Sequence, residues 1–150
     1  VGRAGGDRRG RVRAMKYADT SWWVAWALPD DRHHVESLQL LGHLGPAETV
    51  LTTNLVVGET WNFLRRRDSH RSAVGFLDAV EGLVAGGKLL VHHVDEAQEE
   101  AARRWLRRHD ERAYSFVDAA GFQVMRDRRL REALAFDGDF SAAGFVELRG

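Results

Sequence analysis

The stretch YADTS, residues 17–21, places an aspartate, Asp19, at the end of a short run of strand-forming residues. Three further acidic residues lie inside or beside segments that otherwise consist of core residue types: Glu59 in NLVVGETWNFL, Asp118 in SFVDAAGFQVM and Asp137 in ALAFDGDF. A buried carboxylate costs several kcal/mol unless a cation or hydrogen bonds compensate its charge. Four such residues in one chain therefore indicate that the fold gathers them around a cation.

The composition is that of one globular domain without thiol chemistry. A chain of 150 residues is long enough to bury a sizeable single core. The lack of cysteine excludes disulfides, thiolate metal sites and cysteine nucleophiles, and it favours a cytoplasmic location. The sequence holds no apolar run of membrane-spanning length and no signal-peptide pattern, so we expect no membrane association.

The formal net charge of +0 hides an uneven distribution, because residues 1–16 are strongly basic and the rest of the chain is acidic in sum. Residues 1–14, rich in glycine and arginine, are predicted to be a disordered basic extension. This segment is either an arm that binds nucleic acid or an extension upstream of a domain over residues 15–150. The strand pattern that starts directly after Met15 favours the second interpretation. An acidic body does not attract nucleic acid through its overall field, so such contacts require local arginines or a bound metal.

Strand and helix patterns alternate along the chain. Short β-rich runs predict strands at 16–20, 49–52, 88–92, 133–136 and 145–148. Helical periodicity predicts helices at 22–28, 32–44, 55–67, 70–85, 96–108 and 116–126, with a helical turn at 139–143. The expected N-caps are Thr20 or Ser21, Asn54, Asp95 within a capping box, and Ser115. This alternation predicts an α/β fold with a mainly parallel sheet of four to five strands, covered by helices on both faces.

Three of the acidic residues also have an ordinary structural explanation. Glu59 lies at the edge of an apolar helix stripe, where a surface glutamate is common. Asp118 follows Ser115 at the spacing of a helix N-terminal motif and would complement the helix dipole there. Asp137 begins an Asp-Gly sequence of the kind found in tight turns. Each of the three is therefore weak evidence for a site when it is taken alone.

Asp19 is the least easily explained by local structure. Asp-Thr-Ser at 19–21 is compatible with a helix cap, but Asp19 falls at the end of an apolar strand. In parallel sheets, ligands bind beyond the carboxyl ends of the strands, which is where Asp19 and Asp137 are expected to lie. Asp139, two residues further on, is nearly as good a candidate as Asp137.

Taken in order, five segments resemble one protein family. They are YADTSWW at 17–23, TTNLVVGETWNFLRRR at 52–67, VDEAQEEAA at 94–102, YSFVDAAGFQVM at 114–125 and ALAFDGDFSAAGF at 133–145. The chain resembles the PIN-domain ribonucleases, most closely the VapC toxins of bacterial toxin–antitoxin modules, over nearly everything from Met15 onward. The resemblance implies a three-layer α/β/α sandwich and an endoribonuclease that depends on Mg²⁺, with Mn²⁺ as an alternative. It also implies hydrolysis of RNA phosphodiester bonds by attack of a metal-activated water.

By the same resemblance, Asp19 and Asp118 are expected to bind the metal, and Glu59 and Asp137 to complete the catalytic acidic pocket directly or through water. The division of roles between Asp137 and Asp139 stays open, because Gly-Asp at 138–139 replaces a more basic pair. Mg²⁺ suits such a pocket, since it prefers oxygen ligands and is commonly held by one or two carboxylates together with substrate phosphate.

Expected partners follow from the resemblance and from residues near the acidic set. The residues expected to contact RNA are Thr20, Ser21, Asn62, Arg65 and Arg66. For the two arginines the alternative is a solvated helix end, since cations stabilise any helix C-terminus. The resemblance also implies a cognate VapB-like antitoxin and a homodimer. Two other functions stay open: a catalytically silent PIN-like interaction module, and a PIN nuclease outside any toxin–antitoxin system.

Overall fold

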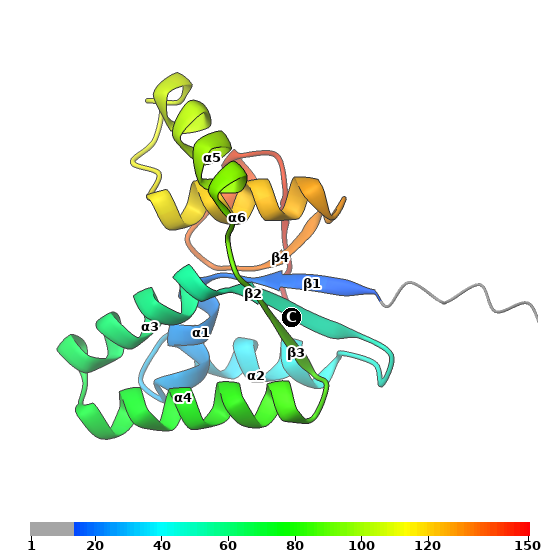
Figure 1. The fold of residues 1–150 in the computed structure, drawn as a ribbon. Helices are drawn as coiled ribbons and strands as arrows, with labels where there is room; N and C mark the ends of the chain where they lie inside the picture. The colour runs from blue at the N-terminus through cyan, green and yellow to red at the C-terminus, as the bar shows by residue number, and fades with distance from the viewer. Residues whose placement is uncertain (1–13) are drawn as a thin grey trace, which may run out of the picture.

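A computed structural model describes residues 14–150, which form one parallel sheet with helices on both faces (Figure 1). The strands are β1 (Met15–Ala18), β2 (Thr49–Thr53), β3 (Leu89–His92), β4 (Glu132–Leu134) and β5 (Val146–Glu147). Their order across the sheet is β3-β2-β1-β4-β5, and every pairing is parallel. The predicted α/β fold with a mainly parallel sheet of four to five strands is confirmed, and the sheet has five strands. The predicted basic extension lies outside the described residues, apart from Ala14.

The helices form the two outer layers (Figure 1). One face of the sheet carries α1 (Thr20–Ala27), α2 (His34–Gly42), α3 (Asn54–Arg67) and α4 (His70–Ala85). The other face carries α5 (Glu96–Arg108) and α6 (Phe116–Asp127), and the short α7 (Asp139–Ala142) packs beside α6 and β5. Within residues 14–150, every helix is too short or too polar to span a bilayer.

Two predicted N-caps are wrong by one residue. The carboxylate of Asp19, rather than a hydroxyl of the next two residues, caps α1 by accepting the backbone N–H of Ser21. Thr53 caps α3, and the side chain of Asn54 instead accepts the N–H of Val94 at 2.9 Å. In both places the strand runs directly into the helix, so the last residue with an extended backbone becomes the cap.

A close contact between Tyr17 and Gly121 sets the distance between β1 and α6. Tyr17 and Asp19 are two residues apart, so their side chains leave the sheet on the same face. Tyr17 is fully buried, with its ring centroid 5.5 Å from that of Phe140. A Cβ atom on Gly121 would lie 2.4 Å from Tyr17 Oη and 2.9 Å from Cζ. Only glycine therefore lets α6 approach β1 this closely, which brings Asp118, one helical turn before Gly121, towards Asp19.

We expect Gly121→Ala to lower the free energy of unfolding by about 1–3 kcal/mol, the usual cost of overpacking. Gly75→Ala in α4 is the matched control, because nothing lies within 4 Å of a Cβ there. The free energy of unfolding of the control should rise by up to about 1 kcal/mol, because alanine has a higher helix propensity than glycine. Urea unfolding measures both changes, and adding Tyr17→Phe to Gly121→Ala should restore part of the loss. An equal gain in stability for the two glycine variants would contradict the steric explanation.

Candidate metal centre

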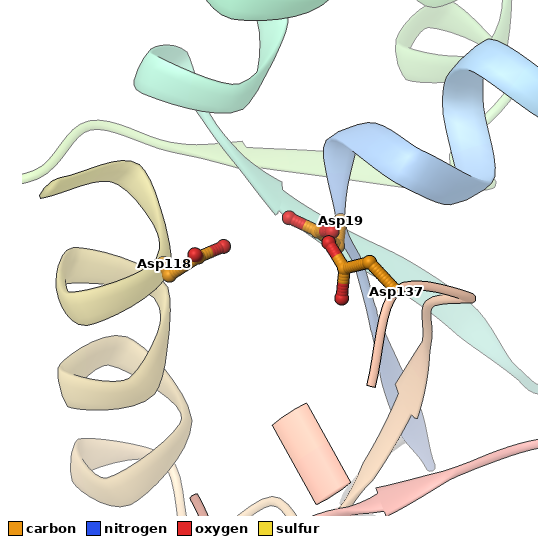
Figure 2. Close-up of side chains that lie close together, drawn as sticks. All are labelled: Asp19, Asp118 and Asp137. Carbon is orange, nitrogen blue, oxygen red and sulfur yellow. The ribbon is translucent and has the colours of Figure 1, made fainter. Parts of the chain in front are cut away.

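Three aspartates from separate elements converge at the carboxyl edge of the sheet. Asp19 follows β1, Asp118 lies in the first turn of α6, and Asp137 lies in the turn after β4 (Figure 2). One carboxylate oxygen from each residue lies within 4.8 Å of the other two. Asp19 and Asp118 are only 1% and 6% exposed, whereas Asp137 is exposed at the mouth of the group. The three residues line a cavity of about 500 Å³.

The position of Asp19 is fixed by hydrogen bonds on both sides. Its carboxylate Oδ2 accepts the N–H of Ser21 at 3.3 Å and the Ser21 hydroxyl at 2.9 Å. Its own N–H donates to the carbonyl of Leu134 on β4 at 3.0 Å. The Ser21 hydroxyl also accepts the N–H of Phe136 at 3.0 Å. Ser21 thereby joins the end of β1 to the segment that carries Asp137.

Asp118 belongs to the N-terminal cap of α6 as well as to the acidic group. Its N–H donates to Ser115 Oγ, and its Oδ2 accepts the N–H of Ser115, both at 3.0 Å. The side chain points towards Asp19 (Figure 2). The capping explanation and the site explanation therefore hold together, because the cap orients the carboxylate towards the cavity.

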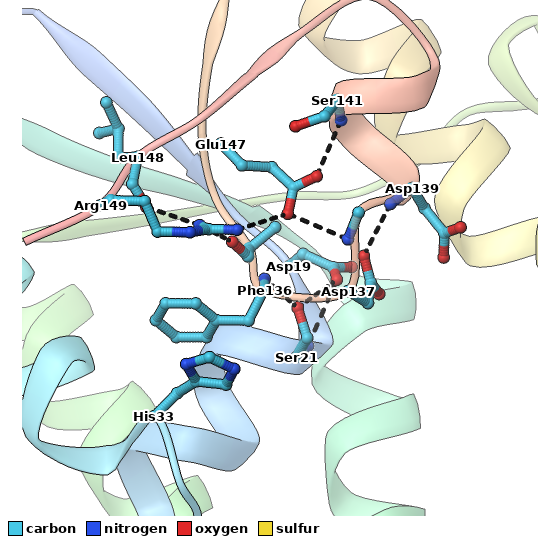
Figure 3. A network of polar contacts seen from close by, with 12 residues as sticks. Asp19, Ser21, His33, Phe136, Asp137, Asp139, Ser141, Glu147, Leu148 and Arg149 are labelled. Atoms are coloured by element: carbon cyan, nitrogen blue, oxygen red, sulfur yellow. Dashed lines mark hydrogen bonds and ion pairs between the residues drawn. The ribbon is translucent and has the colours of Figure 1, made fainter.

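Asp137 is presented by a turn that a second buried carboxylate holds in place. Gly138 has a left-handed backbone, φ 84°, which glycine adopts without a Cβ penalty. The carboxylate of Glu147 accepts the N–H of Gly138 at 3.1 Å and the N–H of Ser141 at 2.9 Å (Figure 3). The Glu147 side chain is 1% exposed and pairs with Arg149 at 3.4 Å. The conformation around Asp137 is thus anchored from β5.

The three carboxyl groups are difficult to ionise together. The pKa of Asp19 is raised well above its ordinary value, by burial first and then by the negative charges of Asp137 and Asp118. Burial, assisted by the charges of Asp137 and Asp139, raises the pKa of Asp118 to about 6. The pKa of Asp137 is also raised, by partial burial and then by the charges of Asp139 and Glu147. Such a group retains excess negative charge that protons or a cation must compensate.

The donor set fits a hard divalent cation. Within residues 14–150 the recorded hydrogen bonds to these three carboxylates come from backbone N–H groups and one serine hydroxyl, and no basic side chain forms an ion pair with them. Three convergent carboxylates with room for water and phosphate match the oxygen-rich coordination of Mg²⁺ or Mn²⁺. A partly buried cluster of this kind can hold a metal ion, because the ion would offset repulsion that residues 14–150 leave without a basic partner.

Comparison with known proteins places the chain in a family. A family model described as the PIN domain matches residues 16–146. The chain belongs to the PIN-domain family. It is 47% identical over 135 residues to the 23S rRNA-specific endonuclease VapC20 of Mycobacterium tuberculosis, in strains CDC 1551 and H37Rv, covering 90% of this chain and 98% of that protein.

A solved structure of the same relative also matches this chain. The crystal structure of M. tuberculosis VapC20, described as a Sarcin-Ricin loop cleaving toxin, superposes with a TM-score of 0.82 at 45% identity. The match covers 91% of this chain and 100% of that one. The resemblance to VapC-type PIN domains is therefore confirmed, as is the three-layer α/β/α architecture that it implies.

The two other predicted acidic residues of this PIN domain line the cavity but lie outside the close group. Glu59, half-buried on α3, faces the same cavity. Asp139 also lines it, but Arg112 binds Asp139 Oδ1 through Nη2 at 2.9 Å and Nε at 3.0 Å. The structure therefore places the carboxylate of Asp137, rather than that of Asp139, close to the carboxylate of Asp19. Metal ligation by any of these residues stays a prediction.

The residues predicted to contact RNA divide into two sets. Thr20 and Ser21 line the cavity, and Thr20 Oγ1 is buried without a hydrogen-bond partner in the described part of the chain. Asn62, Arg65 and Arg66 are exposed on α3 and are not among the cavity-lining residues. An RNA contact for these three requires a substrate that extends beyond the cavity, and it stays a prediction.

Sequence reasoning missed four residues that shape the site. Glu147 has a readable signal, since it is an acidic residue within the apolar final strand, the same pattern that singles out Asp19. Arg112 lies in the loop before α6 and has no such signal. Arg32 and His33 line the cavity from the loop before α2, and nothing in the local sequence indicates it.

We expect the stabilisation of this protein by Mg²⁺ to increase with pH. A carboxyl whose folded pKa is raised stabilises the fold while protonated, and that contribution is lost as pH rises through the folded pKa, about 6 for Asp118. Bound Mg²⁺ must displace the proton, so each pH unit below that value should weaken binding up to about tenfold per protonated ligand. Thermal unfolding with Mg²⁺ and with EDTA, at about pH 5 and about pH 7.5, measures the difference.

Asp118→Asn is the control for this pH dependence. The variant has no titrating carboxyl at position 118, so the Mg²⁺-induced shift in Tm should be smaller at the higher pH and change less between the two. An equal Mg²⁺-induced shift at both pH values in the unmodified protein would show that these carboxylates do not bind the ion.

Proposed function

We propose that this protein is a metal-dependent endoribonuclease toxin of the VapC type. The observation that carries the proposal is the convergence of Asp19, Asp118 and Asp137, whose oxygens lie within 4.8 Å of one another. No basic side chain among residues 14–150 forms an ion pair with them. The family relationship adds that VapC20, which is 47% identical, is an endonuclease that acts on 23S rRNA. A silent interaction module would have no reason to retain a buried, mutually repulsive group at the edge of an open cavity.

The three aspartates would hold the ion, with Mg²⁺ as the expected metal and Mn²⁺ as the alternative. When bound, such an ion supplies Lewis-acid stabilisation of the phosphate and activation of water for attack on the phosphodiester. Asp19 and Asp118 would contribute buried negative charge from fixed positions, since hydrogen bonds at their helix caps orient both. Glu59, which lines the cavity from α3, would orient water or complete the pocket. Thr20 and Ser21 would contact the RNA backbone beside the acidic group.

The proposed substrate class is ribosomal RNA, and the proposed target is the sarcin–ricin loop of 23S rRNA. This assignment rests on VapC20, whose names describe it as 23S rRNA-specific and as cleaving that loop. Cleavage of a synthetic stem–loop RNA of that sequence, with mapping of the 5′ ends, tests it directly. If the stem–loop stays intact while another RNA is cleaved, the proposed nuclease activity stands and the proposed substrate is wrong.

A cognate VapB-type antitoxin and a homodimer complete the proposal. Both follow from membership of the VapC group. Light scattering of the purified protein should give about twice the 16.9 kDa mass of the chain if it is a dimer. Co-purification with a VapB-type protein, and loss of cleavage in that complex, would test the antitoxin.

We expect Asp19→Asn to reduce cleavage by more than about 100-fold while leaving the fold intact, because the variant loses a metal-binding charge. Asparagine caps helices as well as aspartate does, so α1 should keep its start. Removing one of three repelling carboxylates should leave the metal-free Tm unchanged or higher. RNA cleavage and thermal unfolding are measured in parallel, with Asp78→Asn on the exposed face of α4 as the control. Full activity in Asp19→Asn would refute the mechanism.

Replacing Arg65 or Arg66 with glutamine should weaken RNA binding uniformly across sequences. If each arginine contacts a phosphate, the slope of log affinity against log salt concentration should fall by about 1 per substitution. Arg131→Gln is the control, since Arg131 is exposed just before β4, at the amino ends of the strands, whereas the acidic group lies at their carboxyl ends. Filter binding over a range of salt concentrations measures the slopes. Unchanged slopes in both α3 variants would assign these arginines to helix stabilisation alone.

A further inference from the structure

A stack of side chains stands beside the acidic group. The rings of His33 and Phe136 are parallel, with centroids 4.3 Å apart and an interplanar angle of 4° (Figure 3). The guanidinium of Arg149 lies over the Phe136 ring, 5.3 Å from its centroid. His33 and Phe136 both line the cavity that contains Asp19 and Asp137. The cavity therefore has an aromatic part as well as an acidic part.

The stack is tied to the acidic group by short hydrogen bonds. The N–H of Phe136 donates to Ser21 Oγ at 3.0 Å, and Ser21 Oγ donates to Asp19 Oδ2 at 2.9 Å. On the other side, Arg149 Nη1 donates to the carbonyl of Ala135 at 2.8 Å. The Phe136 ring is thus held at a fixed position relative to Asp19.

Arg149 and His33 are both partly exposed members of the stack, and of these two only His33 is among the cavity-lining residues. The backbone N–H of His33 donates to Asp31 Oδ1 at 2.8 Å, and Arg32 Nε donates to the ring atom His33 Nε2 at 3.1 Å. About a quarter of its side chain, 26%, is exposed. Among the described residues that line the cavity, Arg32 and His33 are the basic ones, and all the other charged ones are acidic. The His33 imidazole, with the Arg32 guanidinium beside it, therefore lies at a cavity whose other charged side chains are carboxylates.

We propose that His33 and Phe136 form a nucleobase site, in which the base next to the cleaved phosphodiester stacks against the His33 ring. This inference rests on the proposed ribonuclease function and deepens it. Proteins read unpaired RNA by stacking its bases on aromatic and histidine rings. The cavity of about 500 Å³ has room for a nucleotide. Because Ser21 links Phe136 to Asp19, a base seated on the stack would hold its own phosphate near the aspartates.

The test combines a base deletion with a side-chain deletion. A synthetic sarcin–ricin stem–loop RNA is made intact and with an abasic residue on either side of the cleaved bond. For the unmodified protein, loss of the stacked base should lower kcat/KM on the order of 10-fold. His33→Ala should cause a similar loss on the intact RNA and almost no further loss on the abasic RNA. His33→Phe should retain most of the activity, because it keeps the stacking surface.

A binding measurement separates this inference from the proposed function. The same RNA carries 2-aminopurine at the tested position, and its fluorescence should be quenched by the unmodified protein and by His33→Phe but not by His33→Ala. His43→Ala, an exposed histidine at the end of α2, is the matched control and should behave as the unmodified protein in both assays. Fluorescence quenching without RNA cleavage would contradict the proposed nuclease function and support the nucleobase site.

Two results would overturn the base site. One is an equal loss for His33→Ala on intact and abasic RNA, which would make His33 a structural residue. The other is fluorescence quenching that does not depend on His33. Cleavage of the intact RNA under either result would leave the proposed function standing, so the two failures are distinguishable.

Discussion

Electrostatic repulsion among three carboxylates is the constraint that the rest of this structure accommodates. Asp19, Asp118 and Asp137 are held with oxygens within 4.8 Å of one another, two of them almost fully buried. Water cannot screen charges in such a place as it does at a surface. Burial therefore raises the pKa of all three carboxyl groups, and neighbouring carboxylates raise each pKa further. The fold must therefore supply rigid supports from several directions, since the side chains alone would move apart.

Those supports come from different layers of the sandwich. Ser21 links the end of β1 to the segment after β4, and Glu147 in β5 fixes the turn that carries Asp137. The contact between Tyr17 and Gly121 brings α6 close to the sheet. Each support is a contact between a few atoms. Ser21 holds Asp19, Glu147 holds the turn of Asp137, and the contact between Tyr17 and Gly121 positions the helix of Asp118. Together they explain why a repulsive cluster persists in a fold that is otherwise packed around aromatic and aliphatic residues.

The sequence predicted the order of elements and the converging aspartates because both depend on local pattern. An acidic residue within an apolar run is visible without coordinates, and so is the alternation of strands with helices. The choice between Asp137 and Asp139 was not predictable, because it depends on Arg112, which lies 27 residues before Asp139 in sequence. The need for glycine at position 121 was equally hidden, since the clash that demands it involves Tyr17 on another element. The stack of His33 on Phe136 likewise joins loops that share no sequence signal.

The central place of β1 in the sheet has a consequence for synthesis on the ribosome. The first strand of the chain pairs with β4, so Tyr17 lies beside Ala133 and Ala18 beside Leu134. A growing chain that already exposes Asp19 lacks this neighbour, and lacks Asp137, until residues 132–137 have been translated. The acidic group is therefore completed only after β4 and Asp137 have been translated. For a protein proposed to cut ribosomal RNA, any nascent chain shorter than this lacks part of the proposed metal site.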